Sequence, residues 1–255
     1  MRYFRIFLLH FENVFQCRSA IFVWFLISLF HPIIYLLFWR GSTTTFSDVT
    51  YYYLFFLVAG GLLFVHVETD AYEDIQQGQL SAYLLKPLSY LTAKFFSELP
   101  WRLIQGGFGI LTLLFIVIMT PSLPHLSFQI NQVGTAVIIT VFGYMIMFLF
   151  KMIILLLALW FTDIGGLQQL SEVLIITFAG FIMPIRFFPE WIAHIIYFTP
   201  FPYSVYFPVV AFQGLIPAGQ VISIFGIQLF WIVTLFLIYQ RLWTKGIMKY
   251  SGVGQ

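Results

Sequence analysis

The chain has 255 residues, of which 61% are apolar and only 9% are charged. Soluble domains carry about 25% charged residues, so this composition excludes a fold that is surrounded by water. The net charge of +2 is too small to indicate a nucleic-acid partner. A single cysteine, Cys17, excludes an internal disulfide framework.

The apolar residues predict a helical membrane protein. A helix that crosses the bilayer core takes about 20 mostly apolar residues, and the sequence lacks the strict alternation that is typical of membrane β-barrels. We therefore expect an all-α integral membrane fold that forms one transmembrane domain over residues 1–255. The six expected transmembrane helices cover residues 19–39, 51–67, 103–119, 133–161, 170–183 and 221–239.

Residues 1–18 predict a helix that lies in the membrane interface. Apolar residues recur at helical spacing from Phe4 to Phe15, whereas Arg5, Glu12 and Gln16 share the opposite side, a pattern typical of interfacial helices. The alternative is that this segment is the frayed start of the first span. Its apolar run resembles a signal peptide, but polar residues interrupt it and no A-x-A-like cleavage site follows, so we expect it to be retained.

Charged residues gather between the second and third spans, in residues 68–102. The whole chain has 12 basic and 10 acidic residues, and eight of these lie in this segment: Glu68, Asp70, Glu73, Asp74, Lys86, Lys94, Glu98 and Arg102. A polar segment of this size between two apolar spans predicts a region that faces water and a partner protein.

Within this segment the residues predict a short helix that is held out from the membrane. Acidic residues near its start suit the helix dipole, Gly78 suits its C-terminal cap, and Pro87 ends the apolar stretch that follows. We interpret the segment as a coupling helix through which a soluble partner acts on the spans. The alternative, a plain solvated loop, explains the charge but not the apolar residues among 81–85.

Residues 184–217 combine six of the eleven prolines with many aromatic residues. The segment is too apolar for an ordinary loop and too rich in proline for one straight helix. Because irregular backbone at membrane depth must be buried in protein, we expect short re-entrant helices on the outer side, between the fifth and sixth spans.

Six spans place both chain termini and residues 68–102 on one side of the membrane. That side then holds nine of the 12 basic residues. The positive-inside rule therefore makes this side cytoplasmic.

The sequence contains no catalytic motif. Its five histidines are isolated, no pair has the spacing of a metal site, and the P-loop pattern G-x-x-x-x-G-K-[ST] is absent. Gly106, Gly107 and Gly109 lack the P-loop lysine and predict close helix packing instead. We therefore expect no enzyme activity, metal or cofactor in this chain; if ATP drives the protein, another chain binds it.

Lys151 is the one basic residue inside an expected span. A charge at membrane depth is costly and often marks a transport pathway, although a lysine near the cytoplasmic end can instead extend to the interface. Asp163 and Glu172 are expected to be helix caps or ion-pair partners. Arg186 and Glu190 are expected to form a local ion pair on the outer side, and with Lys151 they are candidate pathway or gate residues.

Two stretches resemble a branch of the bacterial type-2 ATP-binding-cassette (ABC) permeases. The run from Gly78 to Leu88, GQLSAYLLKPL, is similar to the first cytoplasmic loop of these proteins. Residues 178–184 (FAGFIMP), 188–191 (FPEW) and 199–214 are similar to their segment around the fifth span, although Ala179 replaces a small hydroxyl residue. Both stretches occur in the family order and, with the six-span layout, extend the resemblance over most of the chain.

The resemblance implies the membrane subunit of an ATP-driven transporter, and such family members are mostly exporters. The subunit would pair with a second permease subunit, identical or related, and with two cytoplasmic ATPase subunits that bind ATP and Mg²⁺. The implied location is a bacterial cytoplasmic (inner) membrane with both termini in the cytoplasm, and the implied cargo is an amphipathic or hydrophobic molecule. The coupling segment would contact the ATPases through Glu73, Asp74, Gln76, Gln77, Tyr83 and Lys86.

A secondary transporter powered by an ion gradient is the main alternative. Such a protein would require inverted repeats, discontinuous helices in matching halves and buried carboxylates. The two halves of this sequence do not match, and no Asp or Glu lies in the middle of an expected span. A membrane-embedded enzyme is disfavoured because no catalytic constellation is present.

Overall fold

The computed structural model describes residues 2–16, 18–40, 46–119, 130–161 and 163–250. These residues form helices joined by short connections, and no β-strand occurs among them. The α-helices are α1 (Arg2–Gln16), α2 (Arg18–Trp39), α3 (Phe46–Leu63), α4 (Val67–Gln76), α5 (Leu80–Leu84), α6 (Tyr90–Met119), α7 (Ile130–Leu156), α8 (Gly165–Phe178), α9 (Glu190–Tyr197), α10 (Phe201–Ser204), α11 (Tyr206–Phe212) and α12 (Ala218–Ile247). Two 3-10 turns, η1 (Leu157–Leu159) and η2 (Ile185–Phe187), follow α7 and α8.

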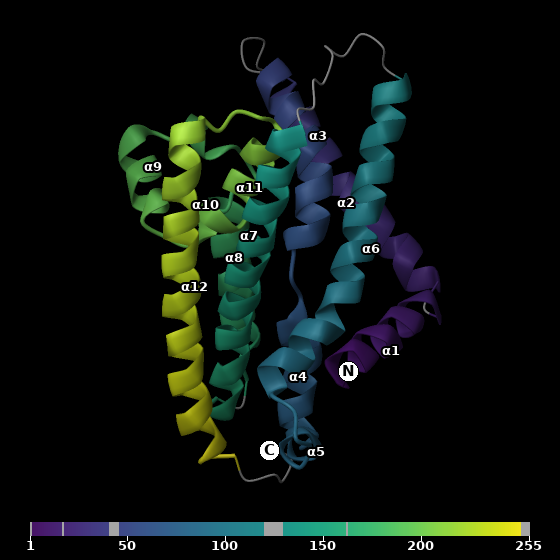
Figure 1. The fold of residues 1–255 in the computed structure, drawn as a ribbon, viewed down its shortest axis with the longest axis vertical. Coiled ribbons are helices and arrows are strands. Elements are labelled where there is room, and N and C mark those ends of the chain that lie inside the picture. The colour runs from purple at the N-terminus through teal and green to yellow at the C-terminus, as the bar shows by residue number, and fades with distance from the viewer. Residues whose placement is uncertain (1, 17, 41–45, 120–129, 162, 251–255) are drawn as a thin grey trace.

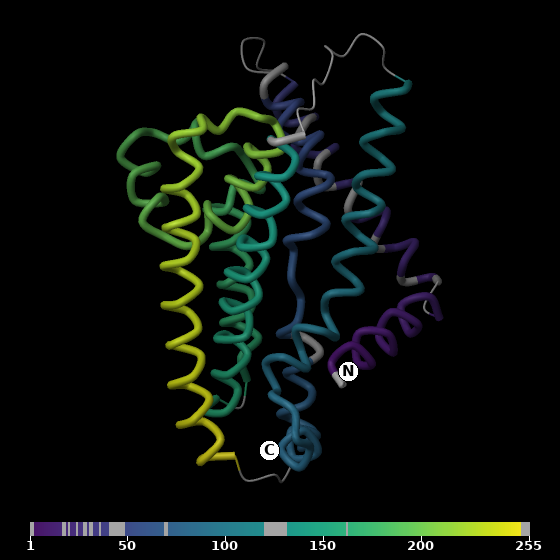
Figure 2. Tube along the Cα trace, in the orientation of Figure 1, coloured from purple at the N-terminus to yellow at the C-terminus, as the bar shows by residue number. Residues whose placement is uncertain are grey.

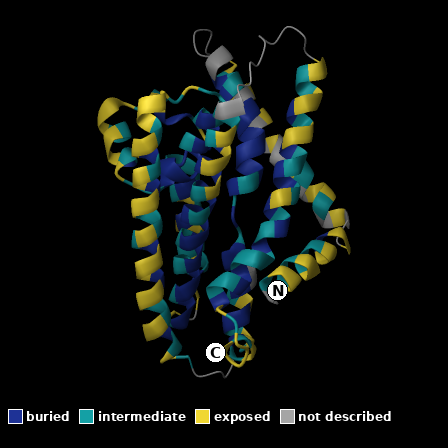
Figure 3. Cartoon of the chain, in the orientation of Figure 1, coloured by how far each residue is buried: buried dark blue, intermediate teal, exposed yellow. Residues whose placement is uncertain are grey.

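α3 and α7 form the centre of the bundle. α2 and α6 pack against α3, whereas α10, α11 and α12 pack against α7 (Figure 1). The side chains of α3 are buried from Tyr52 to Gly61, while one whole face of α12 is exposed (Figure 3). The exposed face of α12 is apolar, with Leu229, Phe230 and Val233 about half exposed or more, as expected for a surface that contacts lipid.

The short helices lie at the two ends of the bundle. α4 and α5 share one end with α1 and the C-terminal end of α12, whereas α9, α10 and α11 lie toward the opposite end (Figure 1). α1 turns away from α2 and packs against α6, where the rings of Tyr3 and Phe96 stack with centroids 5.8 Å apart. α1 is therefore a separate helix from α2, and its place in the membrane interface stays a prediction.

Three described helices are long and apolar enough to cross a membrane: Tyr90–Met119, Gln132–Leu159 and Ala218–Ile247. A shorter apolar helix covers Val49–Leu63. The all-helical prediction is confirmed for the described residues, and the six-span arrangement stays a prediction.

Several helix boundaries differ from those predicted, and the start of α6 differs most. α6 begins at Tyr90, not near residue 103, so the second half of segment 68–102 belongs to a long helix. Gly165 and Gly166 are the first residues of α8, so this helix begins before the expected span at residues 170–183. The Asp163 carboxylate accepts a hydrogen bond from the Gly165 N–H at 2.7 Å, although the N-cap residue of α8 is Ile164.

Residues 184–217 contain η2, α9, α10 and α11, and the re-entrant placement of these short helices on the outer side stays a prediction. The turn before them is attached to α3, because Tyr52 and Tyr53 donate hydrogen bonds to the carbonyl oxygens of Gly180 (2.8 Å) and Phe181 (3.1 Å). Gly180 has a φ of +94°, and a Cβ there would lie 2.6 Å from the Tyr52 hydroxyl oxygen. Only glycine fits this turn without strain.

Two glycines of α6 allow it to pack closely on α3. A Cβ on Gly109 would lie 2.1 Å from the carbonyl oxygen of Leu57, and one on Gly106 would lie 2.4 Å from the Leu62 side chain. A Cβ on Gly107 would meet no atom within 4 Å. The prediction of close packing is therefore confirmed for Gly106 and Gly109 and is wrong for Gly107.

We expect Gly109→Ala to destabilise the protein by about 1–3 kcal/mol, the usual cost of overpacking a well-packed contact. The new methyl group would force α6 away from the α3 backbone. Gly107→Ala on the same helix is the matched control and should leave the protein equally stable or slightly more stable, because alanine favours helix over glycine. The measurement is the melting temperature of each variant in mild detergent. Equal melting temperatures for both variants would contradict the close contact.

Candidate functional site

A short break separates α3 from α4. α3 ends at Leu63 and α4 begins at Val67, and the three residues between them are not helical (Figure 2). Helix ends leave backbone N–H and C=O groups without intrahelical partners, and such groups are costly when they are buried. Val65 is buried, and Phe64 and His66 are partly buried. Other elements must therefore supply hydrogen bonds to the break.

Glu98 and Arg102 of α6 supply these hydrogen bonds. The two residues are buried and form an ion pair across one helical turn, with Arg102 Nε 3.0 Å from Glu98 Oε1. The Glu98 carboxylate accepts a hydrogen bond from the His66 backbone N–H at 3.1 Å, and the Arg102 guanidinium donates one to the Phe64 carbonyl oxygen. This pair, which we call the bracket, satisfies the backbone on both sides of the break and thereby positions α4 relative to α3.

Lys151 of α7 connects the start of α4 to α8. Its ammonium group lies 2.6 Å from Glu68 Oε1 on α4 and also forms an ion pair with Glu172 on α8. Lys151 is 1% exposed and Glu68 is 3% exposed. Burial raises the pKa of the Glu68 carboxyl, and the positive charge of Lys151 opposes this shift. We call these three residues the triad; Glu172 is confirmed as an ion-pair partner, as the sequence predicts.

A further ion pair holds the far end of α4. The Lys94 ammonium of α6 lies 2.6 Å from Asp74 Oδ2, and the Tyr90 hydroxyl donates a hydrogen bond to the same oxygen at 3.2 Å. The Lys94 ammonium also lies over the ring of Tyr83 in α5, 5.5 Å from its centroid, a favourable cation–π distance. The bracket, the triad and this pair attach α4 to α6, α7 and α8 along its whole length.

The side of α4 and α5 that faces away from these ion pairs is exposed. Glu73, Gln77 and Lys86 have exposed side chains, whereas Gln76 and Tyr83 are partly buried. Leu85 is 88% exposed, although it is a large apolar residue that water would not stabilise. These residues form a surface of mixed polarity at the end of the bundle (Figure 3). Asp74, the remaining predicted contact residue, is buried in its ion pair with Lys94.

The prediction that segment 68–102 faces water is therefore wrong for many of its charges. The buried members are Glu68, Asp74, Lys94, Glu98 and Arg102. The physical reason is that α6 starts at Tyr90, so Lys94, Glu98 and Arg102 lie on one helical face, and that face packs toward α3 and α4. Their spacing of four residues is a sequence signal for this common face. The partners across the bundle have no such signal in the sequence.

The two outer candidates belong to η2 and α9, whereas the triad joins α4, α7 and α8. Arg186 belongs to η2 and Glu190 begins α9, and both are exposed. The Arg186 guanidinium lies over the ring of Phe187, 5.0 Å from its centroid. The structure therefore does not bring Arg186 and Glu190 together with Lys151. Their local ion pair and their role as gate residues stay predictions.

The triad and His66 include donor atoms that a metal ion could bind. One ligand atom each from His66, Glu68 and Glu172 lies within 4.8 Å of the others. The Lys151 ammonium already lies between the two carboxylates, so a metal ion would have to displace a positive charge that both carboxylates contact. This arrangement favours lysine as the resident cation.

We expect Lys151→Met to destabilise the protein by about 3–5 kcal/mol, the usual cost of leaving a buried charge without its partner. Replacing all three charges, in Glu68→Gln, Lys151→Met, Glu172→Gln, should restore much of this loss because no unpaired charge then remains. Lys245→Met, at an exposed position of α12, is the control. The measurement is the melting temperature in mild detergent. If Lys151→Met alone melts at the same temperature as the unmodified protein, the ion pairs of the triad are contradicted.

Comparison with known proteins assigns the chain to a family. The family model described as ABC-2 family transporter protein matches residues 20–254, which include all of the elements from α3 to α12. Neither the curated proteins nor the solved structures contain a match to this chain. The extent of the family match, together with apolar helices long enough to cross a membrane, shows that this chain belongs to the ABC-2 family of transporter proteins, as a membrane-embedded permease subunit.

Proposed function

We propose that this chain is the membrane subunit of an ATP-driven exporter, and that α4 and α5 receive the movement of separate ATPase subunits. Membership of the ABC-2 family supports a transport subunit that associates with ATPases and with a membrane partner. The observation that carries the proposal is the two-sided character of α4. Its outer residue Glu73 is exposed, whereas Glu68 and Asp74 form ion pairs with α7 and α6.

A segment of this kind can bind a partner on one side and transmit displacement through the other. Ion pairs that are buried are weakly screened by water, so they hold α4 in a defined position relative to the helices they join. A push on α4 would therefore be passed to α6, α7 and α8 together. This transmission is what a transporter needs when ATP is hydrolysed in another chain.

The proposed arrangement has six spans, namely α2, α3, α6, α7, α8 and α12. α1 would lie in the cytoplasmic interface of a bacterial inner membrane, with both termini in the cytoplasm, and residues 184–217 would form the outer re-entrant segment. Two ATPase subunits would bind ATP and Mg²⁺, and a second permease subunit would complete the pathway. The amphipathic or hydrophobic cargo is proposed from the family resemblance and the apolar spans.

An ion-driven secondary transporter remains the second candidate, because buried ionisable groups within membrane proteins often lie on ion pathways. The triad is such a group. Its position favours coupling instead, because Lys151 lies near the C-terminal end of α7 and contacts α4 directly. The two candidates differ in one measurable property, which is whether an ATPase co-purifies with the chain.

We expect Glu73→Lys to reduce ATPase co-purification from the native host about tenfold, equivalent to about 1.4 kcal/mol. Reversing an exposed charge disturbs the complementarity of a protein interface, and Glu73 makes no ion pair within the described residues. Glu190→Lys, at the opposite end of the bundle, is the matched control and should leave co-purification unchanged.

The ATPase bound to each variant is quantified after purification in mild detergent, together with its hydrolysis rate. Unchanged association of Glu73→Lys would count against contact through α4. If the unmodified chain elutes without any ATPase, the exporter proposal fails and the ion-driven candidate takes its place.

A further inference from the structure

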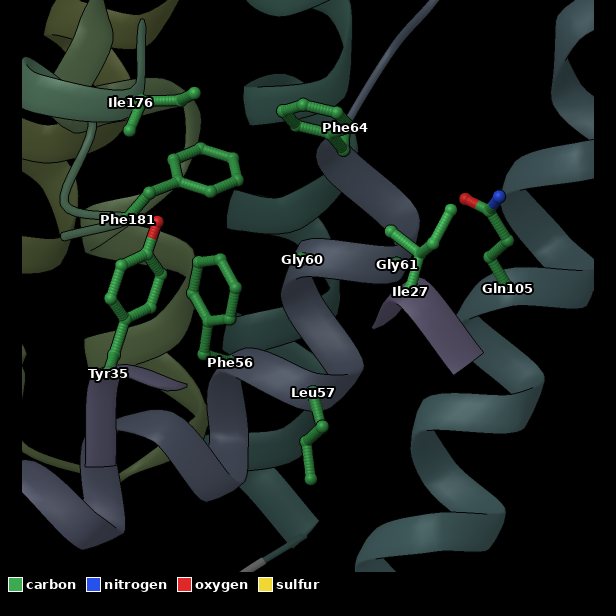
Figure 4. A pocket seen from close by; sticks show the side chains of 10 residues that line it. All are labelled: Ile27, Tyr35, Phe56, Leu57, Gly60, Gly61, Phe64, Gln105, Ile176 and Phe181. Carbon is green, nitrogen blue, oxygen red and sulfur yellow. The ribbon is translucent and has the colours of Figure 1, made fainter. Parts of the chain in front are cut away.

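An apolar cavity lies beside the break between α3 and α4. The space between its walls is about 620 Å³ when the open mouth is included. Most of its wall is apolar, and the large apolar side chains are Ile27, Phe56, Leu57, Phe64, Ile176 and Phe181. In Figure 4 the rings of Tyr35, Phe56 and Phe181 gather on one side, and Gln105 approaches from the other.

Water is a poor occupant of this cavity. A buried water molecule needs two to four polar partners, and only Tyr35 and Gln105 bring polar side chains to the wall. The side-chain amide oxygen of Gln105 already accepts a hydrogen bond from Arg102 at 2.8 Å. Apolar cavities bind apolar ligands for this reason.

The mouth of the cavity continues into the lipid-facing surface of α2. Ile27 belongs to the wall and is 36% exposed, and among the described side chains of α2 its neighbours Val23, Phe30 and Ile34 are exposed and apolar. In a membrane, hydrocarbon chains of lipids surround such a surface. The bilayer therefore supplies an apolar, flexible ligand directly at the opening.

We propose that this cavity binds one hydrocarbon chain of a membrane lipid, which enters from the bilayer past α2. Gly60 has no side chain to occupy the cavity, and a Cβ at this position would lie 2.8 Å from the Phe56 ring. A bound chain lies against Phe64, whose carbonyl oxygen accepts the Arg102 hydrogen bond, and against Gln105, which Arg102 also contacts. The lipid therefore contacts the residues that form the break and the bracket.

The test uses the purified chain in lipid nanodiscs, with a phosphatidylethanolamine that carries a photoreactive diazirine on one acyl chain. After illumination, mass spectrometry locates the labelled residues. We expect labels on peptides that contain Phe64 and Phe181, in addition to the lipid-facing surfaces of α6 and α12. Labels confined to those outer surfaces would overturn the proposal.

A pair of variants on α2 sharpens the test. Ile27→Trp places a large ring in the mouth and should reduce the labelling at Phe64 and Phe181 about tenfold, a loss of about 1.4 kcal/mol in affinity. Ile33→Trp, at an exposed position of α2 that is not part of the wall, should leave that labelling unchanged. Equal labelling in both variants would also overturn the proposal. Because the assay contains no ATPase, its result is independent of the proposed ATPase coupling.

Discussion

Lys151 places a positive charge inside a largely apolar bundle, where it is 1% exposed, and the structure around it follows from the need to pair that charge. An unpaired ammonium group in an apolar environment is far too costly to persist. Glu68 and Glu172 approach it from two different helices, so the pairing requires α4, α7 and α8 to meet at one point. Charge pairing therefore determines where the coupling segment attaches to the bundle.

The bracket pairs the backbone groups at the nearby break between α3 and α4. A chain that leaves a membrane span and continues as a separate helix must expose backbone groups at the junction. One ion pair on α6, Glu98 with Arg102, provides an acceptor for the His66 N–H and a donor for the Phe64 carbonyl. Because these two hydrogen bonds pair the backbone groups on both sides of the break, they favour a single arrangement of the surrounding chain. We infer that the break is a defined joint, and that the bracket and the triad limit the directions in which α4 moves.

Much of this architecture can be predicted from the sequence, because it depends on local patterns. Hydrophobic runs predict the long helices, Gly78 marks the end of α4 with a φ of +74°, and the prolines after residue 184 mark a series of short helices. The same patterns suggest that the charges of segment 68–102 are solvated, which is wrong for five of them. The error arises because burial depends on partners that lie far away in the sequence, such as Lys151, which comes 83 positions after Glu68.

The spacing of Lys94, Glu98 and Arg102 does predict that they share a helical face, but not which element covers that face. The role of Lys151 shows the same limit. Composition identifies it as an unusual charge, and only the fold distinguishes an ion-pair partner from a lysine that extends to the interface. The start of α6 is also hard to predict, because Pro100 lies inside the helix and does not end it. Packing in the bundle outweighs the local cost of proline there.

The central claim is that movement of α4 reaches the spans through the triad, and a distance measurement tests it most directly. Spin labels at Gln77, which directly follows α4, and at Trp191 on α9, in a Cys17→Ser background, report the separation of the two ends of the bundle in the complex with the proposed ATPase. We predict that ATP shifts this distance distribution in the otherwise unmodified chain. In the variant Glu68→Gln, Lys151→Met, Glu172→Gln, the ATPase should still bind, but the shift should disappear. The same shift in both chains would show that packing alone transmits the movement, and would contradict the account.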